Sequence, residues 1–245
     1  MSRRKAALIT GAAARIGACT AETLHERGCD VLLHYNSSAD RTARLAEKLN
    51  SRRDNSAFVA QADLSVPAGI ESLSMAFREH FDRMDILVNN ASRFYPTRVG
   101  ETLAWQWDDL INSNLRGPYF LVQALLPEIQ TAGGSIINIV DIHAERPMSN
   151  HGVYSISKAG LAMMTRALAI ELGPAVRVNG VSPGAILWAE NEDDDSTRQA
   201  ILDRTVMKRT GEACDIASAV AYLALDAPYV TGQILAVDGG RSLNM

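Results

Sequence analysis

The chain has 245 residues, a net charge of −4, 47% hydrophobic residues and 21% charged residues, ordinary values for a globular protein that forms one large α/β domain. The acidic balance, with no basic run longer than Arg3–Lys5, argues against a nucleic-acid partner, and no apolar segment has the length of a signal peptide or a membrane span. Cys19, Cys29 and Cys214 are an odd, scattered set without metal-ligand spacing, so we expect reduced thiols in a cytoplasmic protein and no metal site.

The first predicted unit is a strand, a glycine-bearing turn and a helix. Ala6–Thr10 is a short apolar run typical of a buried strand, the turn G-A-A-A-R-I-G follows it, and a helix is expected from Ile16 to Arg27. Gly11 permits the turn, and Gly17 lets the helix approach the strand. Backbone N–H groups and the helix dipole then point at one place, so this unit predicts a phosphate-binding site.

The second strand indicates which dinucleotide the site prefers. Val31–His34 is the next apolar run, and it is followed by neutral residues, with no carboxylate before Asp40. An acidic residue at this place usually holds the ribose 2′-hydroxyl of NAD. Tyr35, Ser37 and Ser38 are neutral hydrogen-bond donors that can bind a 2′-phosphate, which an acidic residue would repel. The sequence therefore predicts NADP.

Further units continue the alternation of strands and helices. The expected elements are, in order, helix Asp40–Arg52, strand Ala57–Gln61, helix Ile70–Phe81, the apolar strand ending at Asn89, and a long helix from Trp105 to Leu126. Asp63 and Leu64 follow one of these strands and Asn90–Ser92 follow the next, at the strand ends where open α/β sheets bind ligands. Asn114 in the long helix is either a solvated residue or the anchor of a buried water beside the site.

The strongest chemical signal lies between Ser135 and Leu172. Ser135–Val140 is a buried strand, and the helix after it carries Tyr154 and Lys158 one turn apart on one face. Asp141 stands just past the strand. These three side chains can transfer a proton together, and the lysine charge is expected to favour the phenolate and lower the tyrosine pKa toward working pH. A tyrosine and a lysine at this spacing alone mean little, because they occur by chance in many helices.

The rest of the chain completes one sheet. Strand Arg177–Val181 runs into Ser-Pro-Gly, an irregular acidic segment follows, and a helix over Asp215–Leu225 precedes the last strand, Ile234–Val237. Seven strands alternate with helices, with no repeat, linker or composition break. The fold class is therefore α/β, a single doubly wound Rossmann-type domain over residues 1–245 with a seven-stranded parallel sheet and a substrate loop near residues 185–210.

Five motifs occur in the order typical of one family. T-G-A-A-A-R-I-G, N-N-A-S, Asn114, Y-x-x-x-K and S-P-G resemble the short-chain dehydrogenases/reductases over about Lys5–Leu243. The resemblance implies that Tyr154 exchanges the proton, that Lys158 also holds the nicotinamide ribose, and that Asn114 supports a water relay. It also implies a homotetramer, because family members usually pair their long helices into dimers and tetramers.

Three departures from the common family pattern resemble the pteridine reductases, a branch that reduces pterins and folates. Arg15 stands where the family usually has glycine, Ser92 replaces a glycine, and Asp141 replaces the catalytic serine. That branch also has an aromatic residue at the position of Phe94. It usually places an arginine at the position of Ser37 to hold the 2′-phosphate; its absence weakens the preference for NADP, and Arg41 is the candidate substitute.

The departures suit a pterin chemically. A ketone presents only an acceptor oxygen, whereas a pterin edge presents N–H donors, for which the Asp141 carboxylate is the better partner. Asp141 also raises the pKa of Tyr154 and keeps its proton available, while Lys158 opposes that shift. Phe94 either covers the flat heterocycle or is core packing. Trp188 either lines the pocket or packs on a neighbouring subunit, and His143 and His151 are interpreted as loop residues.

The resulting assignments form three overlapping sets. The catalytic residues are expected to be Asp141, Tyr154, Lys158 and Asn114. The residues expected to bind NADPH are Gly11, Arg15, Ile16, Gly17, His34, Tyr35, Ser37, Ser38, Asp63, Leu64, Asn90, Ala91, Ser92, Tyr154, Lys158, Pro183 and Gly184. The residues expected to bind the substrate are Arg15, Ser92, Phe94, Asp141, Tyr154 and Trp188.

The expected activity is an NADPH-dependent reduction of dihydropterins, with dihydrofolate as a further substrate. The alternative within the enzyme class is a carbonyl or 3-oxoacyl thioester reductase, against which Asp141 argues. A third hypothesis from another class is a non-catalytic NADP-binding sensor. A pure binder has no need of Tyr154, Lys158 and Asn114 together, so this hypothesis ranks last.

Overall fold

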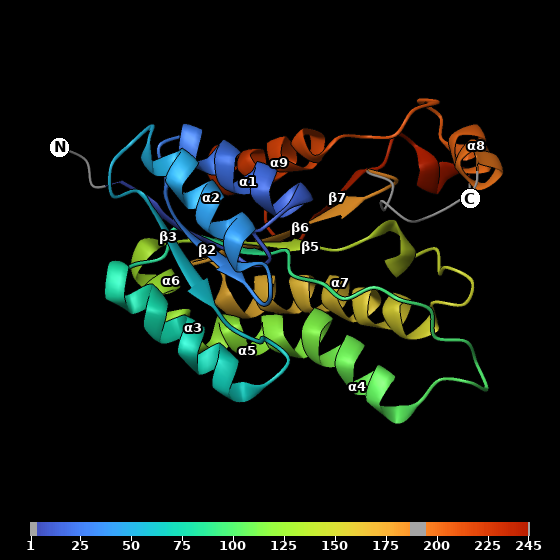
Figure 1. Cartoon of the computed structure of the whole chain (residues 1–245), viewed down its shortest axis with the longest axis horizontal. Coiled ribbons are helices and arrows are strands. Elements are labelled where there is room, and N and C mark those ends of the chain that lie inside the picture. The colour runs from blue at the N-terminus through green and yellow to red at the C-terminus, as the bar shows by residue number, and fades with distance from the viewer. Residues whose placement is uncertain (1–3, 187–194, 245) are drawn as a thin grey trace.

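The computed structural model describes residues 4–186 and 195–244, and a seven-stranded, all-parallel sheet forms its centre (Figure 1). The strand order is β3-β2-β1-β4-β5-β6-β7. The strands are β1 (Ala6–Ile9), β2 (Asp30–Tyr35), β3 (Ala57–Gln61), β4 (Ile86–Asn89), β5 (Ser135–Ile139), β6 (Arg177–Pro183) and β7 (Ile234–Val237). This confirms the predicted doubly wound α/β fold.

Helices cover both faces of the sheet. They are α1 (Arg15–Glu26), α2 (Ala39–Asn50), α3 (Pro67–His80), α4 (Ala104–Ile111), α5 (Gly117–Ala124), α6 (Leu126–Ala132), α7 (Gly152–Leu172), α8 (Asp195–Arg204) and α9 (Ala213–Ala221). Figure 1 shows α1, α2 and α9 above the sheet and α3, α4, α5 and α7 below it. Parallel strands need such crossover helices, which leave the central strands buried on both faces.

The two faces of each strand feed two separate cores. Ile9 of β1 packs in the core beneath α1, α2 and α9, whereas its neighbour Leu8 packs in the core against α3, α5 and α7. Both side chains are fully buried. Side chains of successive strand residues point to opposite faces, so a continuous apolar run is what a strand between two helical layers requires.

The long helix expected from Trp105 to Leu126 is interrupted. The π-helix η1 (Asn112–Arg116) joins α4 to α5, and α6 begins as a separate helix at Leu126. Asn114 lies inside η1 and is buried, so the solvated alternative is wrong. Single π turns inside α-helices often occur at functional sites. Here the π turn carries a side chain that holds the loop after β4.

The C-terminal third differs from expectation in two places. The acidic segment predicted as irregular contains α8 from Asp195 onward, and residues 187–194 of the loop predicted near 185–210 lie outside the described residues. The helix expected at Asp215–Leu225 begins at Ala213 and ends in the π-helix η3 (Tyr222–Asp226). Two short 3-10 helices, η2 (Ile142–Ala144) and η4 (Arg241–Leu243), follow β5 and β7.

The strand order fixes the place of the site. The chain runs outward from β1 through β2 to β3 and then returns to the other side of β1 with β4. Crossovers on the two sides of this switch point leave a crevice at the carboxyl ends of the strands, where ligands bind. Among the residues that the structure describes, no helix combines the length and apolarity of a membrane span.

Candidate active site

A cleft of about 830 Å³ lies at the carboxyl ends of the central strands. Gly11 follows β1, Tyr35 ends β2, Asn90 follows β4 and Pro183 ends β6, and all four residues line it. The structure brings into this one cleft every site residue predicted from the sequence except Asn114, which lies behind its wall, and Trp188, which lies outside the described residues.

The glycine turn after β1 is held from beneath by a histidine. Gly11 has a φ of +65°, and its N–H donates to His34 Nδ1 at 3.1 Å. Burial lowers the pKa of His34 to about 4. The neutral ring therefore accepts through Nδ1 and donates from Nε2 to the Ala62 carbonyl at 3.0 Å. His34, predicted to bind the cofactor, lines the cleft; its Nδ1 holds the turn and its Nε2 ties it to the segment after β3.

Asn90 holds the same turn from the β4 side. Its Nδ2 donates to the carbonyls of Thr10 and Gly11 at 2.8 and 3.0 Å, and its backbone N–H donates to Thr10 Oγ1 at 2.9 Å. A Cβ on Gly17 would stand 2.2 Å from the Gly11 oxygen, so only glycine allows α1 to approach this closely. Thr10, which sequence reasoning missed, thus helps to set the shape of the turn.

The N-terminus of α1 fits an anion. Its cap residue, Ala14, offers no side-chain acceptor to the first-turn N–H groups, and the cleft is lined by Ala13, Ala14, Arg15 and Ile16. Arg15 adopts a φ of +53°, the left-handed region that favours glycine. These residues fit the phosphates of a dinucleotide, and the strained arginine places a positive charge beside them.

The end of β2 presents neutral groups to the cleft. Tyr35, Ser37 and Ser38 line it, and Ser37 is exposed. Asp40, in the first turn of α2, does not line the cleft. Arg41, expected as a substitute for an arginine at position 37, is exposed on α2 and also lies outside the lining. Among the described residues, the β2 end therefore brings no carboxylate to the cleft.

The central contact of the cleft joins a tyrosine to an aspartate. The Tyr154 hydroxyl donates to Asp141 Oδ2 at 2.8 Å, and Asp141 Oδ1 accepts from the His143 backbone N–H at 2.8 Å. The ammonium group of Lys158 donates to the Ile139 carbonyl at 2.9 Å. Tyr154 and Lys158 are both buried, at 6% and 2% exposure, so these charges act in a medium of low polarity.

The direction of the tyrosine shift corrects one expectation. Burial, with the charge of Asp141 second, raises the pKa of Tyr154 well above its usual range, as expected from Asp141. The lowering expected from Lys158 is wrong, because its ammonium lies 5.8 Å from the ring centroid and is directed to a carbonyl. Burial also lowers the pKa of Lys158 to about 8, against a smaller opposing effect of Asp141. The phenol therefore stays protonated, and the lysine, with a pKa of about 8, is still mostly an ammonium at neutral pH.

Asn114 acts on the loop after β4. Its Oδ1 accepts from the Arg93 N–H at 2.8 Å and the Ser92 hydroxyl at 3.2 Å, and its Nδ2 donates to the Arg93 carbonyl at 2.9 Å. A second donation reaches Ser157 Oγ on α7 at 3.1 Å. The amide thus uses both donors within the protein and positions Ser92 and Arg93; its predicted part in a water relay stays a prediction.

Phe94 faces the cleft rather than the core. Its side chain is 43% exposed, so the core-packing alternative is wrong. One face stacks on His151, with centroids 4.7 Å apart and planes within 8°, and Tyr154 meets it edge-on at 4.8 Å. His151, interpreted from sequence as a loop residue, therefore fixes the orientation of Phe94 together with Tyr154, and the exposed part of the Phe94 ring borders the cleft.

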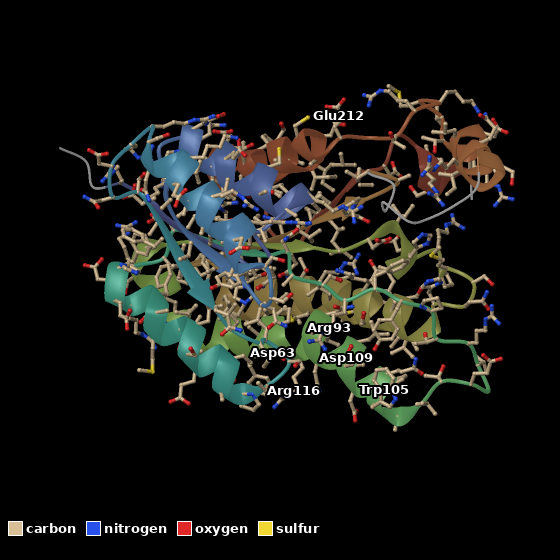
Figure 2. All side chains as sticks on the ribbon, viewed as in Figure 1. Asp63, Arg93, Trp105, Asp109, Arg116 and Glu212 are labelled. Atoms are coloured by element: carbon tan, nitrogen blue, oxygen red, sulfur yellow. The ribbon has the colours of Figure 1, made fainter. Side chains whose placement is uncertain are left out.

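An ion-pair network anchors the neighbouring Arg93. The Arg93 guanidinium pairs with Asp109 of α4 and lies 3.7 Å from Asp63 after β3. Figure 2 shows these three side chains together below the sheet, between α3 and α4. The network ties the loop that carries Ser92 and Phe94 to two other elements. The sequence places the three residues far apart, so no local pattern signals it.

A dinucleotide held by the glycine turn and α1 would end beside a protonated phenol and a buried ammonium, the two groups needed to pair a hydride transfer with a proton transfer. This arrangement on a doubly wound sheet defines the class of Rossmann-type oxidoreductases.

Comparison with known proteins identifies the family. Residues 11–242 match the family model described as Enoyl-(Acyl carrier protein) reductase. The chain belongs to the short-chain dehydrogenase/reductase family, whose reductases use nicotinamide cofactors.

Several curated relatives are similar over nearly the whole chain. Pteridine reductase 1 of Leishmania tarentolae is 36% identical, covering 97% of this chain and 96% of the relative. Dihydromonapterin reductase of Klebsiella pneumoniae is 35% identical, covering 96% of each. A 3-oxoacyl-(acyl-carrier-protein) reductase of Staphylococcus epidermidis is 33% identical, covering 96% and 98%. Identities this close together establish an oxidoreductase of the family without selecting its substrate.

Proposed function

We propose that the protein is an NADPH-dependent pteridine reductase that reduces dihydropterins and dihydrofolate. The observation that carries this proposal is the hydrogen bond of 2.8 Å from Tyr154 to Asp141. A carboxylate has no proton to donate to a ketone oxygen, but it accepts strongly from the N–H groups of a pterin. Two relatives whose names state pterin reduction support the same substrate class.

The residues have distinct proposed roles in the reaction. Bound NADPH would supply the hydride to a carbon of the substrate's C=N bond. Tyr154 would donate its proton to the nitrogen of that bond, so that one hydride and one proton are added. Its raised pKa keeps the proton in place until the nitrogen becomes basic. The Lys158 ammonium would offset the phenolate left behind and hold the nicotinamide ribose.

The substrate ring has a matching surface. Phe94, backed by His151, is partly exposed at the cleft, and we propose that a planar heterocycle packs against that exposed part. Arg15 and Ser92 line the cleft and are proposed to meet both the cofactor phosphates and the polar edge of the substrate. We propose one reductase domain over residues 1–245, with a substrate loop near 185–210 that includes Trp188.

The direct test is NADPH oxidation with dihydrobiopterin, dihydromonapterin and dihydrofolate, set against an acetoacetyl thioester. Turnover of a pterin in clear excess over the thioester supports the proposal. Thioester turnover without any pterin turnover favours the 3-oxoacyl reductase alternative, which the Staphylococcus relative represents. NADPH binding with no turnover of either class favours the non-catalytic sensor.

Ser37→Arg is expected to widen the preference for NADPH over NADH about tenfold. A charge-assisted hydrogen bond to the 2′-phosphate typically contributes about 1.5–3 kcal/mol, and Ser37 is exposed at the mouth of the β2 end. The measurement is kcat/KM for both cofactors with one substrate. NADH serves as the internal control, since it lacks the phosphate. Equal use of both cofactors, unaltered by the substitution, contradicts the proposed NADP site.

A homotetramer in the cytoplasm is the proposed assembly and location. Ile156, Met163 and Ile170 form a stripe on α7 at intervals of seven residues, with exposures of 50%, 62% and 83%. Trp105 on the adjacent α4 is 59% exposed and points outward in Figure 2. Apolar side chains gathered in this way are typical of an interface. The described cysteines are free thiols, as a reducing compartment requires.

Met163→Glu is expected to convert the tetramer into a smaller species in sedimentation velocity, because it buries a charge in that interface. Met75→Glu is the matched control, since Met75 is 57% exposed on α3, away from the stripe. A tetramer that survives Met163→Glu, or one that Met75→Glu disrupts equally, contradicts the α7 interface.

A further inference from the structure

The turn after β7 presents an arginine to the cleft. Gly239 and Gly240 have φ values of +62° and +78°, and the Asp238 carboxylate accepts from the N–H groups of Gly240 and Ser242 at 2.9 and 2.7 Å. The Arg241 N–H donates to the Asp238 carbonyl at 3.1 Å. Both glycines adopt a conformation that other residues rarely do, so D-G-G-R forms a rigid turn. Arg241 therefore starts from a fixed backbone.

The same turn packs on the segment after α8. The Met207 N–H donates to the Gly239 carbonyl at 3.0 Å, and a Cβ on Gly240 would stand 2.9 Å from the Val206 side chain. Figure 1 shows α8 at the right of the molecule, near the C-terminal end of the chain. Arg204, the last residue of α8, is thereby brought toward Arg241, although the two residues are far apart in the sequence.

Arg241 lines the cleft together with Asp141, Ile186 and Ile201. Among the described residues, its guanidinium has no hydrogen bond or ion pair, and its Nε is fully buried without a partner. Buried N–H groups are nearly always satisfied, and an orphaned one requires an explanation. A ligand in the cleft is the explanation that the position of this side chain suggests.

The two carboxylates nearest Arg241 are already engaged by other groups. Burial lowers the pKa of Arg241 and the charge of Asp141 opposes that shift; Arg204 has a smaller lowering effect and Asp238 a smaller raising effect. The oxygens of Asp141 are occupied by Tyr154 and the His143 N–H, and those of Asp238 by the turn. Within the part of the chain that the structure describes, Arg204 has no ion-pair partner, whereas the nearby Arg209 lies 3.8 Å from Asp215.

Arg241 lies at one end of the cleft. β7 is the edge strand of the sheet, and β2, which carries Ser37 and Ser38 at its end, lies toward the opposite edge. Arg241 is therefore far from the end that fits the cofactor's 2′-phosphate. Asp141 and Tyr154 stand between the two ends, since β5 lies between β2 and β7. The cleft thus offers room for the unreacted part of a substrate between Tyr154 and Arg241.

We propose that Arg241, with Arg204 beside it, binds an oxyanion on the tail of the substrate and so selects substrates with an anionic tail. The group is a carboxylate or a phosphate, since a planar guanidinium binds either through paired hydrogen bonds. A folate supplies carboxylates, and a phosphopantetheine or coenzyme A thioester supplies a phosphate. If the oxyanion belongs to a folate, this proposal rests on the proposed pteridine reductase function; if it belongs to a thioester substrate, it does not.

The experiment compares two pairs of substrates that share a reacting group and differ in tail charge. Dihydrofolate and dihydrobiopterin form the pterin pair; acetoacetyl-coenzyme A and the acetoacetyl thioester of N-acetylcysteamine form the thioester pair. The enzymes are the wild type, Arg241→Gln, Arg241→Lys, Arg204→Gln and the control Arg209→Gln. Both kcat/KM and equilibrium binding by calorimetry are measured, so the test does not depend on turnover. NADPH binding and the melting temperature report on folding.

The expected result is selective. Arg241→Gln lowers the ratio of anionic to neutral substrate about tenfold within whichever pair the enzyme accepts, Arg204→Gln lowers it less, and Arg241→Lys restores part of it. Arg209→Gln leaves the ratio unchanged. A ratio in Arg241→Gln equal to that of the wild type in both pairs overturns the proposal. If the enzyme accepts only the thioester pair and Arg241→Gln still lowers the ratio of anionic to neutral substrate, the result refutes pterin reduction and supports the oxyanion site at Arg241.

Discussion

Tyr154→Phe is expected to lower kcat about a hundredfold or more while the protein still binds NADPH. Loss of a positioned general acid typically costs about 10²–10⁴ in rate. Lys158 donates to the Ile139 carbonyl and not to the phenol, so the substitution leaves the lysine in place. The turn at Gly11 is held by His34 and Asn90, on the other side of the cleft. Steady-state turnover and NADPH fluorescence titration check the two halves of the expectation.

The chain offers a matched control for this substitution. The Tyr95 hydroxyl donates to Asp109 Oδ2 at 2.9 Å, a tyrosine–aspartate contact like that of Tyr154 and Asp141, but outside the cleft lining. Tyr95→Phe therefore removes the same kind of hydrogen bond without removing a proton donor from the site. Near-normal turnover in Tyr154→Phe, or an equal loss in both variants, excludes Tyr154 as the acid.

Features set by local pattern could be predicted from the sequence. Continuous apolar runs identified the buried strands, because a parallel sheet between two helical layers buries both faces of each strand. The glycine turn, Asn90, Asp141 and Pro183 could be assigned to one cleft because each follows a parallel strand, and the carboxyl ends of those strands meet at one edge. The seven-stranded fold was confirmed on this basis.

Features that depend on contacts between residues distant in the sequence could not be predicted from the sequence. Asn114, in the π turn, forms hydrogen bonds with Arg93 and Ser157. No local sequence pattern indicates that these two residues lie beside it. The pKa of Tyr154 depends on its burial and on its hydrogen bond to Asp141. Spacing along α7 placed the lysine near the tyrosine ring, but it did not reveal the carbonyl that holds the ammonium. The sequence correctly predicted that Lys158 lies near Tyr154, but not that the tyrosine pKa would be raised despite the lysine.

Asp141→Ser is expected to weaken pterin binding tenfold or more. The variant loses a charge-assisted hydrogen bond to a substrate N–H, which typically contributes about 1.5–3 kcal/mol. Serine retains an acceptor for the His143 N–H that begins η2, because serine is a good N-cap. The fold around the site should therefore survive. If the substrate is a ketone, the same change supplies a hydroxyl donor to its oxygen and turnover should rise.

Asp141→Asn separates charge from shape at the same position. Its amide oxygen can still accept from the His143 N–H, but its NH₂ group then faces the Tyr154 hydroxyl, which must accept instead of donate. The proton of Tyr154 is no longer held, and one acceptor toward the pterin becomes a donor, so the loss should match that of Asp141→Ser. The assay is NADPH oxidation by the wild type and both variants with dihydrobiopterin, dihydromonapterin, dihydrofolate and an acetoacetyl thioester. A wild type inert toward all pterins, with Asp141→Ser faster on the thioester, removes the pteridine assignment and leaves a carbonyl reductase of the same family.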